Sequence, residues 1–165
     1  MNDRKVRYEA LQEALNQRIL VLDGAMGTMI HQRNLTPADF GGPKQDNCPE
    51  QLVRTRPDVI EDIHRAYYAA GSDIVETNSF GSTPIVLEDF GLGHDAYLLS
   101  KMSAELARKV AAEFDVPGRL RFVAGSMGPT TKSITVTGGI TFSELVENFY
   151  VQAKGLIDEI GRAHV

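Results

Sequence analysis

The sequence predicts an α/β fold built around a parallel sheet. Short apolar runs that start near residues 19, 73 and 121 alternate with longer segments of helical periodicity. Strands separated by helices are parallel neighbours, because a crossover helix is what joins them. The strand starts recur roughly every 50 residues, so the 165 residues hold three βα units, which do not close a barrel.

The first unit starts with a charged segment and an apolar run. Residues 7–17 place Leu11 and Leu15 four positions apart, which predicts a short amphipathic helix packed on a larger body. Residues 18–24, RILVLDG, hold four consecutive apolar residues before Asp and Gly, which predicts a first strand buried on both faces. A loop rich in Gly and Pro is expected over residues 36–49.

The next helix has the strongest pattern in the chain. Apolar residues recur at helical spacing from Pro57 to Ala70, where Pro57 suits a first turn and Gly71 suits the end. A short strand is expected over residues 73–80, and a second helical stripe runs from about residue 95 to 114. The strand-then-helix order therefore repeats.

The third unit repeats the same order. Residues 121–129 predict a strand that runs into a Gly-Pro turn, and a loop rich in Thr and Gly covers residues 130–140. A helix is expected from residue 142 to about 157. Thr141 is its expected N-cap, and Glu144 completes a capping box.

Composition excludes several classes of protein. The chain is 42% hydrophobic and 24% charged, the balance of a soluble globular domain, and its net charge of −5 gives no electrostatic reason to expect a nucleic acid or an anionic membrane as partner. The single cysteine, Cys48, forms no internal disulfide, so a cytoplasmic location is expected. Three strands leave both sheet edges unpaired, which predicts a fragment or a chain completed by another copy.

Each predicted strand ends in residues that suit a ligand site, since ligands of parallel α/β folds sit at the carboxyl ends of the strands. Asp23 and two nearby glycines follow the first strand, where a capped tight turn is an equally good interpretation. Glu76 lies inside an apolar strand, so a structural ion pair competes with a site role. The third tip, residues 125–129, is either a turn or a pocket wall.

Other chemically capable residues are less informative. His64 lies between core positions of a predicted helix, which favours helix packing or an outward position over metal binding. His31 and His94 are isolated, and Cys48 has no neighbour at zinc spacing. Lys132 and its neighbouring hydroxyls suit a phosphate, but no dinucleotide or Walker pattern accompanies them.

Several stretches in a fixed order resemble a known family. They are ILVLDGAMGTMI, DFGG, RPDVIEDIHRAYYAAGSDIVETNSFGST, VAGSMGPT and GGITFSELVENFYVQAKGLID, and they run nearly from residue 18 to 158. Together they resemble the amino-terminal homocysteine-binding module of cobalamin-dependent methionine synthases, a (β/α)8 barrel of the homocysteine S-methyltransferase family. The resemblance implies a partial TIM barrel containing the first three βα units only.

The resemblance also implies an activity and a site. The family transfers a methyl group to the sulfur of homocysteine, and zinc activates that sulfur because a thiol with a pKa of ~8.5 is mostly protonated at neutral pH. In methionine synthases methylcobalamin and methyltetrahydrofolate act from other modules of the full-length protein. Matching motifs imply that homocysteine is held by Asp23, Gly24, Met26, Asn78, Ser79, Phe80 and Ser126.

The chain departs from the family in two respects. The family's three zinc-binding cysteines and a second acid lie beyond the third βα unit, and Cys48 matches none of them, so the fragment is expected to be inactive alone. Residues 1–158 are expected to be the amino-terminal part of the homocysteine-binding domain. Residues 159–165, EIGRAHV, are what one frame of a common sequencing adapter encodes and are expected to be non-native. The alternatives are a stand-alone homocysteine methyltransferase that uses another donor, and a non-catalytic small-molecule-binding remnant.

Overall fold

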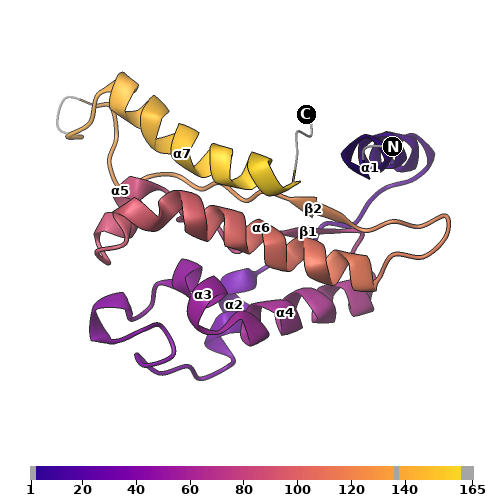
Figure 1. The fold of residues 1–165 in the computed structure, drawn as a ribbon, viewed down its shortest axis with the longest axis horizontal. Coiled ribbons are helices and arrows are strands. Elements are labelled where there is room, and N and C mark those ends of the chain that lie inside the picture. Colours follow the sequence, from indigo (N-terminus) through magenta and orange to yellow (C-terminus); the bar gives the residue numbers. More distant parts are fainter. Residues whose placement is uncertain (1–2, 136–137, 161–165) are drawn as a thin grey trace.

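The protein has a mixed α/β fold that is rich in helix (Figure 1). The computed structural model describes residues 3–135 and 138–160, with side chains from Lys5 onward. The helices are α1 (Asp3–Gln17), α2 (Met26–His31), α3 (Leu52–Thr55), α4 (Pro57–Ala70), α5 (Pro84–Glu88), α6 (Ala96–Glu113) and α7 (Phe142–Ile160), with 3-10 turns η1 (Pro43–Gln45), η2 (Pro49–Gln51) and η3 (Gly93–Asp95). None of the described helices is long and apolar enough to cross a membrane.

The sheet has two parallel strands, β1 (Ile74–Glu76) and β2 (Phe122–Ala124). Val75 lies opposite Val123 in this register. The strands fall inside the two predicted ranges, although both are shorter than expected, and the predicted parallel pairing is confirmed. Val75 is fully buried whereas Glu76 is exposed, so successive β1 side chains point to a covered face and an open face.

The predicted first strand is wrong in two respects. Residues 18–24 form no strand and make a single parallel bridge, between Leu22 and Ile74. They are also not buried on both faces, since Ile19 is 90% exposed and Val21 is 54% exposed. An apolar run becomes a buried strand only if other elements cover it, and none of the described elements covers this one.

The three long helices expected after the strands are confirmed. α4 begins at Pro57 and ends at Ala70, and the next residue, Gly71, adopts the left-handed conformation (φ 113°) that suits glycine just past a helix end. The capping box of α7 is present, because the Glu144 amide donates to Thr141 Oγ1 (3.2 Å) and the Thr141 amide donates to Glu144 Oε2 (2.8 Å).

α4, α6 and α7 lie side by side along the sheet, with α6 in the middle (Figure 1). One core cluster lies among α3, α4 and α6 and includes Leu52, Ile60 and Leu99. A second cluster joins β1 to α4 and α6 through Val75, Tyr68 and Val110. The helices therefore cover one face of the sheet and fix the strands against it.

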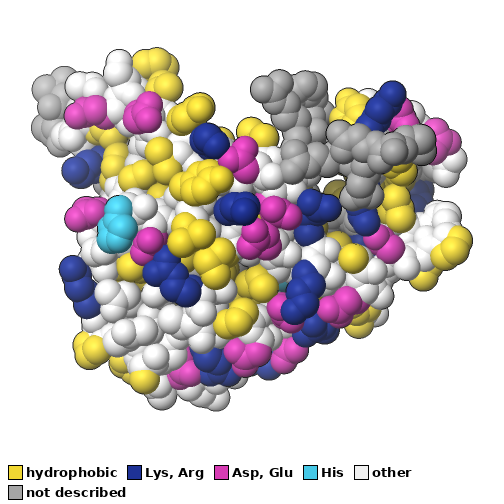
Figure 2. Space-filling view, in the orientation of Figure 1, with side chains coloured by type: hydrophobic (Ala, Val, Ile, Leu, Met, Phe, Trp, Pro, Cys, Tyr) yellow, Lys and Arg dark blue, Asp and Glu magenta, His cyan; other side chains and the backbone are white. Residues whose placement is uncertain are grey.

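Part of the hydrophobic surface stays exposed. On the face seen in Figure 2, hydrophobic side chains gather over α6 and α7, and charged groups are interleaved with them. Leu98, which belongs to the predicted apolar stripe of α6, is 44% exposed. The exposed large hydrophobic side chains of α7 are Phe142, Val146, Tyr150 and Ile157.

α1 differs from the amphipathic helix that its sequence predicts. It spans the predicted residues 7–17 and starts earlier, but Leu15 is 58% exposed. A polar contact attaches it instead, because the Arg7 guanidinium donates to Asp115 Oδ2 (2.6 Å) and to the Arg121 carbonyl (3.2 Å). The leucine pair therefore does not make the expected packing face.

Candidate functional site

The three predicted ligand loops lie together at the carboxyl ends of the strands. The Asp23 amide donates to the Ile74 carbonyl (3.0 Å), and the Thr77 amide donates to the Ala124 carbonyl (2.9 Å). Further on, the Gly128 amide donates to the Phe80 carbonyl (2.9 Å). These bonds join the loop after each strand to its neighbour, so the loops share one edge of the sheet.

A chain of polar contacts crosses this edge from Asp23 to Ser126. The Glu76 amide donates to Asp23 Oδ1 (2.9 Å), and the Ser126 hydroxyl donates to Glu76 Oε2 (3.2 Å). Glu76 lies inside an apolar strand and would be buried if both faces of that strand were covered, but its side chain lies on the open face of the sheet and is exposed. Its carboxylate nevertheless has a partner, which is the serine and not the ion pair considered from the sequence.

Asp23 is the group whose electrostatics are most perturbed in this cluster. Partial burial raises the pKa of its carboxyl to about 6, and the nearby negative charge of Glu76 raises it further, while the Glu76 amide lowers it. A cation beside a partly buried carboxylate strongly stabilises its ionised form, because the cation compensates for the lost hydration.

Three of the other predicted site residues are buried beneath the strand ends. Asn78 Nδ2 donates to the Pro49 carbonyl (2.8 Å), and the Ser79 hydroxyl donates to the Ser126 carbonyl (2.8 Å). Asn78 is 5% exposed, Ser79 is fully buried and Ser126 is 8% exposed. Their polar groups therefore hold the loops in place and form the floor of the site.

The remaining predicted residues border this floor. A Cβ on Gly24 would lie 4.0 Å from the Tyr67 hydroxyl, and Met26 packs against the first core cluster. Phe80 is 59% exposed, and a Cβ on Gly128 would lie 2.5 Å from its ring. Glycine at 128 is what allows the Phe80 ring to lie across the third loop.

Sequence reasoning missed three polar residues that complete the floor. Thr77 Oγ1 lies 2.6 Å from Ser79 Oγ and accepts the Ser126 amide (2.9 Å). Gln152 of α7 is fully buried, and its Nε2 donates to the Ser79 carbonyl (2.5 Å). The signal available for Gln152 was a polar residue on the buried side of a predicted helix.

Glu50 is the third missed residue. It is 7% exposed, and its Oε1 accepts the Gly81 amide (2.7 Å). Cys48, expected to be a loop thiol, is fully buried, and its Sγ lies 3.8 Å from Glu50 Oε2. Burial, followed by the charge of Glu50, raises the pKa of the Cys48 thiol to about 12, so it stays protonated at neutral pH.

The histidines and acids of the described residues do not assemble into a metal centre. No group of three or more His, Cys, Asp or Glu side chains among residues 3–135 and 138–160 is arranged to hold a metal ion. His64, for which the sequence favoured helix packing, is fully buried in α4. Lys132 lies in the exposed part of the 130–140 loop.

Known proteins align with most of this chain. The model of the family described as Homocysteine S-methyltransferase matches residues 20–161. Methionine synthase from Mycobacterium leprae is 44% identical over 149 residues, which is 90% of this chain and 12% of that protein. Methionine synthase from Mycobacterium tuberculosis is 44% identical over 157 residues, or 94% of this chain and 13% of that protein. The chain thus spans about an eighth of the length of these relatives.

Solved structures show the same likeness in three dimensions. The homocysteine methyltransferase MmuM from Escherichia coli, in its oxidized form, superposes with a TM-score of 0.71 at 27% identity, covering 91% of this chain and 53% of that one. Its metallated form gives a TM-score of 0.71 at 25% identity. Because the family model covers most of the chain, the chain belongs to the homocysteine S-methyltransferase family.

Proposed function

We propose that residues 1–158 are the amino-terminal part of the homocysteine-binding module of a methionine synthase. In this proposal the described fold is the first three βα units of a (β/α)8 barrel, and the complete module transfers a methyl group to the homocysteine thiolate to give methionine. Identity of 44% to two mycobacterial methionine synthases supports the assignment. The chain alone would bind substrate without completing the reaction.

The observation that carries the proposal is the position and charge of Asp23. Oδ1 of its carboxylate accepts the Glu76 amide, and in the proposal the carboxylate also accepts the ammonium group of homocysteine. An ammonium ion beside a carboxylate of pKa about 6 stabilises the ionised form. A charge-assisted hydrogen bond of this kind contributes about 1.5–3 kcal/mol.

The other site residues would act around that ion pair. Backbone amides near Gly24 and Met26 would face the substrate carboxylate, and Phe80 would contact the aliphatic chain. Asn78, Ser79 and Ser126 would hold the loops at the right separation, since their polar side-chain groups donate within the protein. Glu76 could add a second negative charge beside the ammonium.

The described residues do not fit the zinc ion of the family. Thiolates are the ligands that activate a thiol substrate, and the only cysteine of the chain is buried with a pKa of about 12. We therefore derive no chemical step through zinc from this chain. In the proposal the zinc ligands belong to another part of a longer cytoplasmic protein. The sites for methylcobalamin and methyltetrahydrofolate also belong to other parts of that protein.

A second candidate is a stand-alone homocysteine methyltransferase with a different methyl donor. The likeness to the Escherichia coli enzyme favours it, because 91% of this chain superposes on 53% of a protein with that title. Identity to that enzyme is 27%, against 44% to the methionine synthases, so the first assignment is the stronger one. Both place homocysteine on the same strand ends.

The last seven residues enter the proposal separately. Residues 159 and 160 end α7, where the Arg108 guanidinium donates to the Glu159 carbonyl (2.8 Å), and residues 161–165 lie outside the described residues. We propose that 159–165 derive from adapter read-through. Genomic DNA that encodes EIGRAHV followed by a stop codon would overturn this proposal.

The binding proposal can be tested with L-homocysteine and the Asp23→Asn variant. Titration followed by NMR should give a dissociation constant at least about tenfold higher for the variant, because the neutral amide cannot form an ion pair with the ammonium group. 4-Mercaptobutyrate, which lacks the ammonium group, should bind both proteins equally. The same substitution at the aligned aspartate of a full-length relative should raise KM for homocysteine, and an unchanged KM would contradict the assignment.

A further inference from the structure

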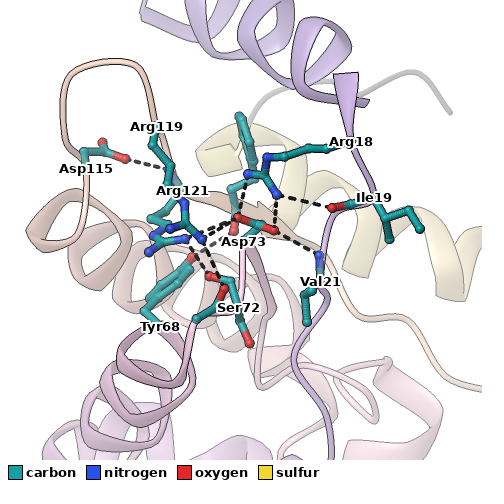
Figure 3. A network of polar contacts seen from close by, with 11 residues as sticks. Arg18, Ile19, Val21, Tyr68, Ser72, Asp73, Asp115, Arg119 and Arg121 are labelled. Carbon is teal, nitrogen blue, oxygen red and sulfur yellow. Dashed lines mark hydrogen bonds and ion pairs between the residues drawn. The ribbon is translucent and has the colours of Figure 1, made fainter. Parts of the chain in front are cut away.

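One buried carboxylate organises the amino ends of the strands. Asp73 directly precedes β1, is 1% exposed and lies among the guanidinium groups of Arg18, Arg119 and Arg121 (Figure 3). Arg18 makes the closest contacts, because its Nη1 donates to Oδ2 (2.7 Å) and its Nη2 donates to Oδ1 (2.8 Å). Such a two-point contact fixes direction as well as distance.

The other two arginines come from a different part of the chain. Arg119 Nη2 donates to Asp73 Oδ1 over 3.2 Å, and Arg121 Nη1 donates to the same oxygen over 3.3 Å. Both belong to the segment that leads into β2. Arg18 is thus the only one of these three arginines that ties the first segment, residues 18–25, to the sheet.

The first segment has few other contacts that could hold its register. Val21 donates its amide to Asp73 Oδ2 (3.1 Å), and its carbonyl accepts the Asp73 and Ile74 amides (2.8 and 3.1 Å). Ile19, Val21 and Leu22 are exposed, so apolar packing contributes little here. Main-chain bonds alone permit a slip of pairing, because they are the same for every residue.

Register decides where Asp23 lies. Successive side chains of an extended segment point to opposite faces, so a one-residue slip would turn the Asp23 carboxylate away from the Glu76 amide. Arg18 and Asp23 are five positions apart, and they contact the residues immediately before β1 and at its end, Asp73 and Glu76. The two side-chain contacts therefore span the strand.

We propose that the Arg18–Asp73 ion pair is a positioning contact for the site, which sets the register of residues 18–25 and thereby holds the Asp23 carboxylate against the Glu76 amide. The role of Asp23 toward substrate in this inference rests on the function proposed above. Arg18 itself lies at the amino ends of the strands, away from the ligand loops, and acts only through Asp23.

Arg119 provides a matched control for this role. Removing either arginine deletes one guanidinium from Asp73 and leaves two, although Arg18 makes two short hydrogen bonds to the carboxylate and Arg119 makes one longer one. Only the loss of Arg18 releases the segment that carries Asp23. A purely structural role for the cluster would give the same result for Arg18→Gln and Arg119→Gln.

The experiment measures Asp23 directly in the complete chain. Carbon-detected NMR titration gives the pKa of the Asp23 carboxyl, and hydrogen exchange reports protection of the Glu76 amide, which Asp23 accepts. Arg18→Gln should move the pKa from about 6 toward the ordinary value of about 4 and reduce the protection at least tenfold. Arg119→Gln should leave both unchanged.

Arg18→Lys keeps the inference testable if the glutamine variant does not fold. Lysine retains the charge but not the two-point contact, so it should shift both readouts in the same direction to a smaller extent. An Asp23 pKa that stays near 6 with a protected Glu76 amide in the folded Arg18 variants would overturn the inference, as would equal effects of Arg18→Gln and Arg119→Gln.

Homocysteine binding separates this inference from the proposed function. If the pKa and the amide respond as expected and the Arg18→Gln variant binds homocysteine about tenfold more weakly, both stand. If the unaltered chain binds no homocysteine while the two readouts still respond, the proposed function fails and the positioning of Asp23 by Arg18 is retained.

Discussion

His64 gives the most quantitative prediction, because it is a titratable group with no polar partner. Its ring is fully buried in α4, and neither Nδ1 nor Nε2 has a hydrogen-bond partner among the described residues. Burial lowers the pKa of His64 to about 4, and the negative charge of Glu61 opposes this only in part. We therefore consider the substitution His64→Leu, which replaces the imidazole with an apolar side chain.

The magnitude follows from linkage between protonation and folding. The unfolded chain takes up a proton near pH 6.5 and the folded chain near pH 4, a difference that corresponds to about 3 kcal/mol. Since the unfolded state binds more protons in this window, the contribution of His64 is fully present above pH 6.5 and is lost progressively as the pH falls toward 4. About 2 kcal/mol is lost by pH 5.

Urea unfolding of the chain and of the His64→Leu variant at pH 7.5 and pH 5.0 measures this contribution. Between pH 7.5 and pH 5.0 the free energy of unfolding should fall by about 2 kcal/mol more for the chain than for the variant. Asp23 acts in the opposite direction, because its raised pKa adds stability as the pH falls through 6, but this change is common to both proteins and cancels.

A comparison at neutral pH makes the result decisive. At pH 7.5 the variant should be as stable as the chain or more stable, since leucine leaves no buried nitrogen without a partner. Equal losses of stability in the chain and in the His64→Leu variant would refute the reasoning.

Two other substitutions test the packing and capping of α7. A Cβ at Gly155 would lie 2.5 Å from the Tyr97 carbonyl of α6, so Gly155→Ala should lower the free energy of unfolding in urea by about 1–3 kcal/mol. At Gly27 an added Cβ meets nothing within 4 Å, so Gly27→Ala should cost nothing. Equal losses for the two variants would contradict the contact. Thr141→Ala removes the hydroxyl that accepts the Glu144 amide and should cost about 1 kcal/mol, whereas an unchanged midpoint would show that the capping box contributes nothing.

The long helices and the parallel pairing could be predicted because their signals are local and repeated. α4 has apolar residues at helical spacing, a proline at its first position and a glycine just past its end, and each signal gives the same boundaries. The meeting of the strand ends followed from the parallel order alone. The short helices α2, α3 and α5 were missed because four to six residues are too few for a periodic pattern.

Burial and partners could not be predicted in the same way, because they depend on residues far away in the chain. The apolar run at 18–24 has the sequence of a buried strand, but neighbouring elements determine its exposure. Gln152 is bonded to the carbonyl of Ser79, 73 positions away, and Glu50 to the amide of Gly81, 31 positions away. A single sequence contains no local sign of which residue Gln152 or Glu50 contacts.

Two parts of the candidate site differ in how firmly they are fixed, and this difference determines which part can vary. Beneath the strand ends, Thr77, Ser79, Ser126 and Gln152 bond to one another or to the neighbouring main chain in a buried region, where losing one bond costs the desolvation of the group left behind. Asp23 has no such support. Its segment is exposed and joined to β1 by a few bonds, so the position of its carboxylate depends on register and not on packing. Substitutions in the first segment should therefore leave the structure of the floor unchanged. Any property that depends on the Asp23 charge should instead change when the contact between Arg18 and Asp73, at the opposite end of the strand, is altered.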